Sequence, residues 1–71
     1  MAQLAIINYE TASIDIINLS EEIEREYADN YDQLVFNKMG YKTSSVYYMI
    51  AENIRINEID EYAIINALEH P

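Results

Sequence analysis

The stretch that most constrains the fold is residues 4–19, which read LAIINYETASIDIINL. Two runs rich in β-branched residues flank residues 10–13, the only candidates for a turn. This pattern predicts a β-hairpin. Thr11 and Ala12 would form a two-residue turn, but such turns favour Asn-Gly or Asp-Gly, so a longer loop in the same register is an equal alternative.

Closing the hairpin at this turn predicts which side chains share a face, because side chains alternate along a strand. One face would carry the pairs Tyr9–Ile14, Ile7–Ile16 and Ala5–Asn18, and the other Asn8–Asp15, Ile6–Ile17 and Leu4–Leu19. Both faces are apolar over most of their length, whereas a hairpin with one solvated face alternates apolar and polar residues. The sequence therefore predicts a sheet that needs cover on both sides.

Residues 20–39 carry apolar side chains at helical spacing and predict a helix. Ser20 is a suitable N-cap, with Asn18 as a rival start. Gly40, the only glycine in the chain, is expected to end the helix in a left-handed conformation. A break at Asp29-Asn30, giving two short helices, is the alternative.

Residues 46–51 (VYYMIA) predict a third strand, and residues 54–57 a fourth that pairs with it after a turn at Glu52-Asn53. In that hairpin Met49 would lie opposite Ile56. Residues 58–69 fit either a short helix or a further strand, and we prefer the helix, with Asn57 as its cap.

The order of these elements predicts the α+β class. We expect a single small domain over residues 1–71. Its sheet would be antiparallel and built from two hairpins in the strand order 2-1-3-4, with one main helix between the hairpins and a short C-terminal helix. The first helix would cover one sheet face, which leaves the second face to the C-terminal segment, to a twin subunit, or to both.

The composition limits the kinds of partner that this protein is expected to bind. The chain has no cysteine, so it forms no disulfide and no thiolate metal site. Thirteen acidic residues against four basic ones give a net charge of −9, which argues against direct binding of nucleic acid or an anionic membrane. No signal peptide and no apolar run of spanning length is seen, so we expect a cytoplasmic protein. Small domains without disulfides or metals often oligomerise, and we predict a homodimer.

Residue types that support catalysis are sparse. His70, the only histidine, stands beside the terminal Pro71, so no Ser-His or Cys-His pair is expected. Residues 29–33 are acidic but lack the spacing and glycine of a calcium loop. One glycine cannot build a phosphate-binding loop. We therefore expect no enzyme activity, no catalytic or metal-binding residue, no cofactor and no small-molecule substrate.

Two groups of residues are candidate interaction sites. Glu22, Glu26 and Asp29 fall on one stripe of the predicted helix and could imitate a phosphate backbone, although a solvated helix face is the simpler interpretation. Tyr47 and Met49 belong to the third strand, where an apolar ring with a polar tip suits a subunit interface. The sequence thus favours a non-catalytic protein-interaction module acting as a homodimer. The alternative is an acidic inhibitor that mimics nucleic acid and binds a basic nucleic-acid-binding protein.

Overall fold

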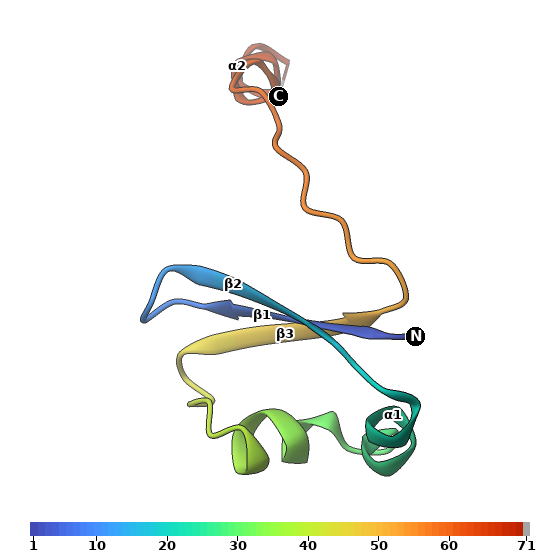
Figure 1. The fold of residues 1–71 in the computed structure, drawn as a ribbon. Helices are drawn as coiled ribbons and strands as arrows, with labels where there is room; N and C mark the ends of the chain where they lie inside the picture. The colour runs from blue at the N-terminus through green and yellow to red at the C-terminus, as the bar shows by residue number, and fades with distance from the viewer. Residues whose placement is uncertain (71) are drawn as a thin grey trace.

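The computed structural model describes residues 1–70 and has the α+β architecture expected from the sequence (Figure 1). Its sheet is antiparallel and three-stranded, in the order β2-β1-β3. The central strand β1 (Gln3–Asn8) pairs on one side with β2 (Ser13–Asn18) and on the other with β3 (Val46–Ala51). The third strand therefore has the bounds and the direction that the sequence predicts.

Helices lie on both sides of this sheet, but only one side is covered. The helix α1 (Glu21–Tyr27) and the π-helix η1 (Gln33–Lys38) pack beneath the sheet in the view of Figure 1. The C-terminal helix α2 (Tyr62–Glu69) stands on the opposite side, at the end of an extended linker of residues 52–61. The predicted C-terminal helix is confirmed, but it begins at Tyr62, so Asn57 lies in the linker and is not its cap. The amide of Tyr62 donates instead to the side chain of Asp60.

The first hairpin forms, but the predicted register is wrong by two residues. Ile7 pairs with Ile14, and the connection is a four-residue loop, residues 9–12. The Asn8 side chain accepts hydrogen bonds from the amides of Glu10 and Thr11, which starts the loop earlier than expected. Ala12 closes it in a left-handed conformation with φ of 53°. Because the shift is even, every side chain keeps its predicted face.

The fourth strand is absent from the described chain, so the order 2-1-3-4 is corrected to 2-1-3. Residues 54–57 run as irregular extended chain after a bend at residues 52 and 53. The amide of Ile54 donates to Oε1 of Gln3 at 2.9 Å, so this donor is engaged by a β1 side chain and not by the backbone of β3. The predicted pairing of Met49 with Ile56 is therefore wrong.

The single helix predicted for residues 20–39 is also wrong, and the alternative break is confirmed. α1 ends at Tyr27, and Asn30 starts a second helical segment by accepting a hydrogen bond from the Gln33 amide. Ser20 caps α1 as predicted, its Oγ accepting from the amide of Ile23. Gly40 follows η1 with a left-handed φ of 81°, as expected for a residue that ends a helix.

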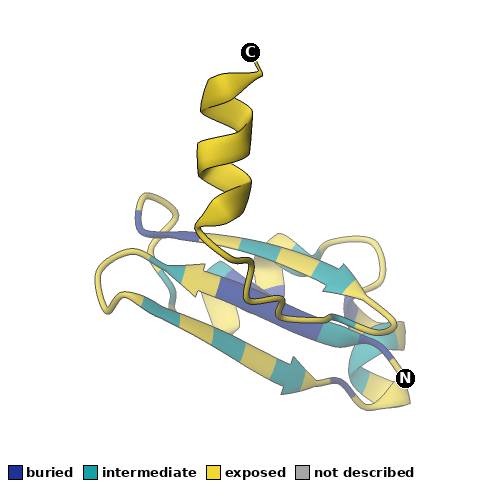
Figure 2. Cartoon of the chain, turned by 90° about the horizontal axis from the view of Figure 1, so that it is seen from above, coloured by how far each residue is buried: buried dark blue, intermediate teal, exposed yellow. Residues whose placement is uncertain are grey.

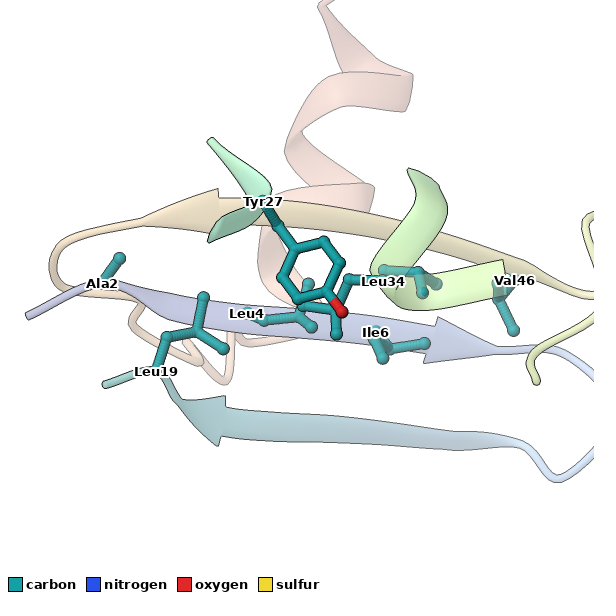
Figure 3. Packing of buried hydrophobic residues seen from close by; sticks show 8 residues of the cluster. Ala2, Leu4, Ile6, Leu19, Tyr27, Leu34 and Val46 are labelled. Atoms are coloured by element: carbon teal, nitrogen blue, oxygen red, sulfur yellow. The ribbon is translucent and has the colours of Figure 1, made fainter. Parts of the chain in front are cut away.

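The core lies between the helices and one face of the sheet, which we call the closed sheet face (Figure 3). The side chains of Leu4, Ile6 and Val35 are fully buried there. Two hydrogen bonds tie the same face to the helical layer and to the loop after it. The Tyr41 hydroxyl donates to Asp15, and the Tyr48 hydroxyl donates to Asp32.

The linker of residues 52–61 and α2 extend away from the sheet and make the molecule elongated (Figure 1). The principal extents are 47 × 26 × 19 Å, and the radius of gyration is 15.6 Å. A compact domain of this length would have a radius of gyration of about 11 Å. Every residue of α2 is exposed, so the helix packs against no other part of the described chain.

Candidate functional site

The second side of the sheet presents an uncovered apolar surface, which we call the open sheet face. It is defined by Ala5, Ile7, Ile14, Ile16, Tyr47 and Met49. Strand alternation produces it, because every second side chain of β2 and β3 is at least partly buried beneath the sheet and the others are exposed above it (Figure 2). Tyr47 is 69% exposed and Met49 is 53% exposed. In a single chain the five large side chains of this face are exposed, whereas Ala5 between them is buried.

The register gives the open sheet face an apolar end and a polar end. Two cross-strand rows, Ile14–Ile7–Tyr47 and Ile16–Ala5–Met49, lie next to each other. The third row is polar at two positions, where Gln3 Nε2 donates to Asn18 Oδ1 at 2.9 Å. The ring of Tyr9 extends the apolar end, packing edge-on against Tyr47 with centroids 5.9 Å apart. With Tyr9, six large apolar side chains thus gather at the hairpin end of the sheet.

The linker adds one wall to this surface. Residues 54–56 and the open sheet face together line a shallow apolar pocket of about 250 Å³. The hydrogen bond between Ile54 and Gln3 fixes the linker there, and Ile54 is the only linker residue that is partly buried. The polar groups of the wall are those of Arg55 and the linker backbone. Such a pocket suits an apolar side chain of a partner rather than a charged ligand.

A second unpartnered apolar surface lies on α2. Ala63, Ile64, Ala67 and Leu68 of the helix, with Ile59 and Asp60 of the linker, line a shallow hollow. The spacing of the four helical residues places them on one helical face. Ile64 is 63% exposed and Leu68 is 76% exposed. We call this surface the α2 stripe.

The outer edges of the sheet are also free within residues 1–70, because only β1 has a partner on each side. β3 has six residues without charge or proline, and such an edge invites pairing with another chain. Both the edge and the open sheet face therefore offer contact surface on the same strand.

Polar contacts at the hairpin loop fix this end of the sheet. Glu10 accepts a hydrogen bond from the Ser45 hydroxyl at 2.7 Å and pairs with Lys42 at 3.4 Å. The hydrogen bond, and then the lysine charge, lower the pKa of Glu10. The Tyr9 amide donates to the Ser45 carbonyl. These contacts join the hairpin loop to the segment that enters β3, and so hold Tyr9 beside Tyr47.

The acidic candidates lie elsewhere. Glu22 and Glu26 are exposed on α1, on the side of the sheet opposite the open face. α1 ends at Tyr27, so Asp29 lies beyond the helix rather than on a continuous three-carboxylate row. None of the three is in an ion pair within residues 1–70. The structure therefore separates the two predicted groups: Tyr47 and Met49 come together on one surface, and the acidic residues belong to another.

The sequence did not single out Ile7, Ile14, Ile16 or the α2 stripe as site residues. A signal for the first three was present, since a hairpin that is apolar on both faces must leave one face for another partner. The α2 stripe has only the weak signal of eight helical residues. The extended linker, which determines that the stripe is exposed, has no recognisable sequence pattern.

No group of three or more acidic or histidine side chains within residues 1–70 is placed to hold a metal ion. None of the helices in this part of the chain has the length and apolar character that a membrane crossing requires. No protein-family model matches the sequence, and comparisons with curated proteins and with solved structures give no significant match.

Proposed function

We propose that this protein is a non-catalytic protein-interaction module that acts as a homodimer through the open sheet face. The observation that carries this proposal is the contiguous apolar surface formed by Ile7, Ile14, Ile16, Tyr47 and Met49. Soluble monomers rarely expose large contiguous apolar patches, and those that occur usually mark a site where another molecule binds. Tyr and Met are also enriched at interface centres, where charged residues are depleted.

Two further features support self-association. The open sheet face carries no charged side chain, so two copies can approach there despite the net charge of −9. A chain of this size buries a smaller fraction of its surface than larger domains do, and a second copy supplies the missing cover. A C2 interface needs only one self-complementary patch.

The mass of the full chain in solution tests the proposal, by sedimentation equilibrium or light scattering at micromolar concentration. The test variant combines Ile16→Lys and Met49→Lys on the open sheet face. The matched control combines Gln33→Lys and Asn37→Lys, which make the same charge change at exposed positions of η1.

We expect a dimer for the unaltered protein and for the control, and a folded monomer for the open-face variant. The circular dichroism spectrum of the variant establishes that its sheet is intact. A monomeric unaltered protein would refute the proposal, and so would a dimer that the open-face substitutions leave unchanged.

A second candidate function is supported by the exposed, unpaired carboxylates of Glu22, Glu26 and Asp29. An acidic surface of this kind can occupy the basic groove of a nucleic-acid-binding protein, with binding that weakens as salt is added. Reversal of all three residues to Lys would then release a partner captured from cell lysate, whereas the open-face variant would retain it. The opposite result assigns partner binding to the open sheet face.

A further inference from the structure

The helix α2 needs a surface to pack against. It has eight residues, and isolated helices shorter than about 12–15 residues are marginal in water. Its N-terminus is supported by a single side-chain contact, from Asp60 to the Tyr62 amide. None of its residues is buried. A helix in this situation is stabilised only if its apolar stripe is covered.

The total exposed area indicates how much cover is missing. The chain exposes 5830 Å². A compact monomer of this mass would expose about 4,600 Å², so about 1,200 Å² of surface is in excess. A stable protein interface of standard size covers about 800 Å² on each partner. The excess is therefore large enough for a full interface on each chain, and the open sheet face and the α2 stripe are exposed apolar surfaces that such an interface would cover.

We propose that α2 of each chain packs with its stripe on the open sheet face of a second copy, so that the two chains exchange their C-terminal segments reciprocally. This inference rests on the proposed homodimer and assigns its contacts. The two surfaces are complementary in kind, since each is mainly apolar, and the charged residues that border them, Asp60 beside the α2 stripe and Arg55 beside the open sheet face, have opposite signs. The exchange covers both at once on both chains, as a C2 arrangement requires.

The linker favours a second copy over the chain's own sheet. Its first part is attached to the sheet by the bond between Ile54 and Gln3, and residues 54–56 already wall the apolar pocket. Beyond this point the linker leads away from the sheet, and α2 is held clear of it (Figures 1 and 2). A neighbouring sheet can meet the α2 stripe while this linker path is kept, whereas packing on the chain's own sheet would require the path to reverse.

The absence of cysteine allows a direct test by cross-linking. One variant carries Ile64→Cys in the α2 stripe, and three others carry a single cysteine on the open sheet face, as Ile7→Cys, Ile16→Cys or Met49→Cys. The helix variant is mixed with each face variant and treated with a short bismaleimide. Reciprocal exchange predicts a covalent dimer containing one chain of each kind from at least one mixture.

A chain carrying both substitutions, Ile64→Cys and the best of the face positions, separates the two packing modes. Exchange gives dimers linked between chains. A link formed within one chain, with none between chains, would overturn the proposal, as would the lack of a mixed product at all three face positions.

Substitutions in the helix provide an independent readout. Ile64→Glu combined with Leu68→Glu should weaken dimerisation at least about tenfold, because two apolar side chains lose their cover. Asn66→Glu, which adds one charge on the other side of the helix and leaves the stripe intact, is the control and should leave the dimer unchanged. If the helix variant stays dimeric while the Ile16→Lys, Met49→Lys variant does not, the result supports the homodimer and refutes the reciprocal packing of α2. A monomeric unaltered protein would refute both proposals.

Discussion

The two faces of the sheet are made by the same strands, yet they meet opposite surroundings. On the closed sheet face Leu4 and Ile6 are fully buried, whereas on the open sheet face Ile7 and Ile14 remain 43% and 53% exposed. Ile6 and Ile7 are adjacent in the chain and differ only in the direction of the side chain. The difference shows that the composition of the strands determines how much apolar surface the sheet carries. It does not determine whether a helix of the same chain packs on that surface.

Connectivity explains which face is covered. α1 begins at Glu21, directly after Leu19 and Ser20, and η1 leads back into β3, so the helices on the closed face are held at both ends by the sheet. α2 is joined at one end only, through residues 52–61. Helices that are joined to strands at both ends pack on their own sheet. A helix that is joined at one end only, such as α2, can pack on another chain.

The largest expected effect comes from the pair Ile6 and Ile7. Ile6→Ala removes a fully buried side chain and should lower the free energy of unfolding by about 2–5 kcal/mol. Ile7→Ala, measured in dilute solution where the chain is monomeric, should cost less than about 1 kcal/mol. Urea denaturation at low protein concentration checks both values.

A loss of several kcal/mol rivals the whole stability of a small domain, so Ile6→Val is the second variant. It should cost about 0.5–1.5 kcal/mol, and Ile7→Val close to nothing. Equal losses at the two positions would mean that the open sheet face is covered within a single chain.

The next effect is the dependence of stability on protein concentration. If two copies cover each other's open sheet faces, unfolding is coupled to dissociation and the melting temperature rises with concentration. For a dimer of chains this size, a tenfold increase should raise Tm by roughly 5 °C. Differential scanning calorimetry over two decades of concentration measures it. The Ile16→Lys, Met49→Lys variant should show no such rise, and a Tm independent of concentration in the unaltered protein would contradict the dimer.

These expectations also show which parts of the fold could be predicted. The doubly apolar hairpin, the third strand, Ser20 as a cap and the role of Gly40 follow from local chemistry, and all four agree with the structure. The register could not be predicted, because it depends on the hydrogen bonds that the Asn8 side chain accepts and on the left-handed conformation of Ala12. Neither feature is evident from the residue type alone. The faces were nevertheless right, since an error of two residues preserves alternation.

The fourth strand shows the limit of pattern reasoning. Residues 54–57 have strand-like alternation, but the Ile54 amide has another acceptor in Gln3, which is distant in sequence. The same tertiary contact directs the linker and so decides that α2 is exposed. At the candidate site, Tyr47 and Met49 were found from residue type, while the α2 stripe depends on a path that only the folded chain determines.

The hairpin loop is shared by both faces, and a substitution there should act on the sheet without acting on the interface. Ala12 has a left-handed φ of 53°, which costs non-glycine residues free energy. Ala12→Gly should therefore stabilise the domain by about 0.5–1 kcal/mol and leave the dimerisation constant unchanged. Gly40→Ala is the matched control of opposite sign. An added Cβ would meet nothing within 4 Å, so its cost of about 1 kcal/mol would come from the backbone alone.

A smaller effect concerns the ionisation of Tyr48, on the closed sheet face, at high pH. The hydrogen bond to Asp32, with a lesser part from burial, raises the pKa of Tyr48 to about 12. The folded state therefore holds this proton more tightly than the unfolded chain does. The resulting stability is fully present below about pH 10 and is lost as the pH rises to about 12. The hydrogen bond to Asp15 also raises the pKa of Tyr41. Phenolate absorbance should therefore show late-ionising tyrosines, and Tyr48→Phe should remove one of them and leave that of Tyr41. A high-pH titration that Tyr48→Phe leaves unchanged would contradict this assignment.

The smallest effect concerns charge, which acts on the closed side of the molecule more than on the uncharged open face. Glu26 lies at the C-terminal end of α1, one turn after Glu22, where both the helix dipole and the neighbouring carboxylate oppose it. Glu26→Gln should raise stability by about 0.3–0.5 kcal/mol at low ionic strength. The gain should shrink between about 0.01 M and 0.15 M sodium chloride, because the screening length falls from about 30 Å to about 8 Å. A gain that does not change with salt would show that the substitution acts through helix propensity, and that the net charge of −9 is too dispersed to affect folding.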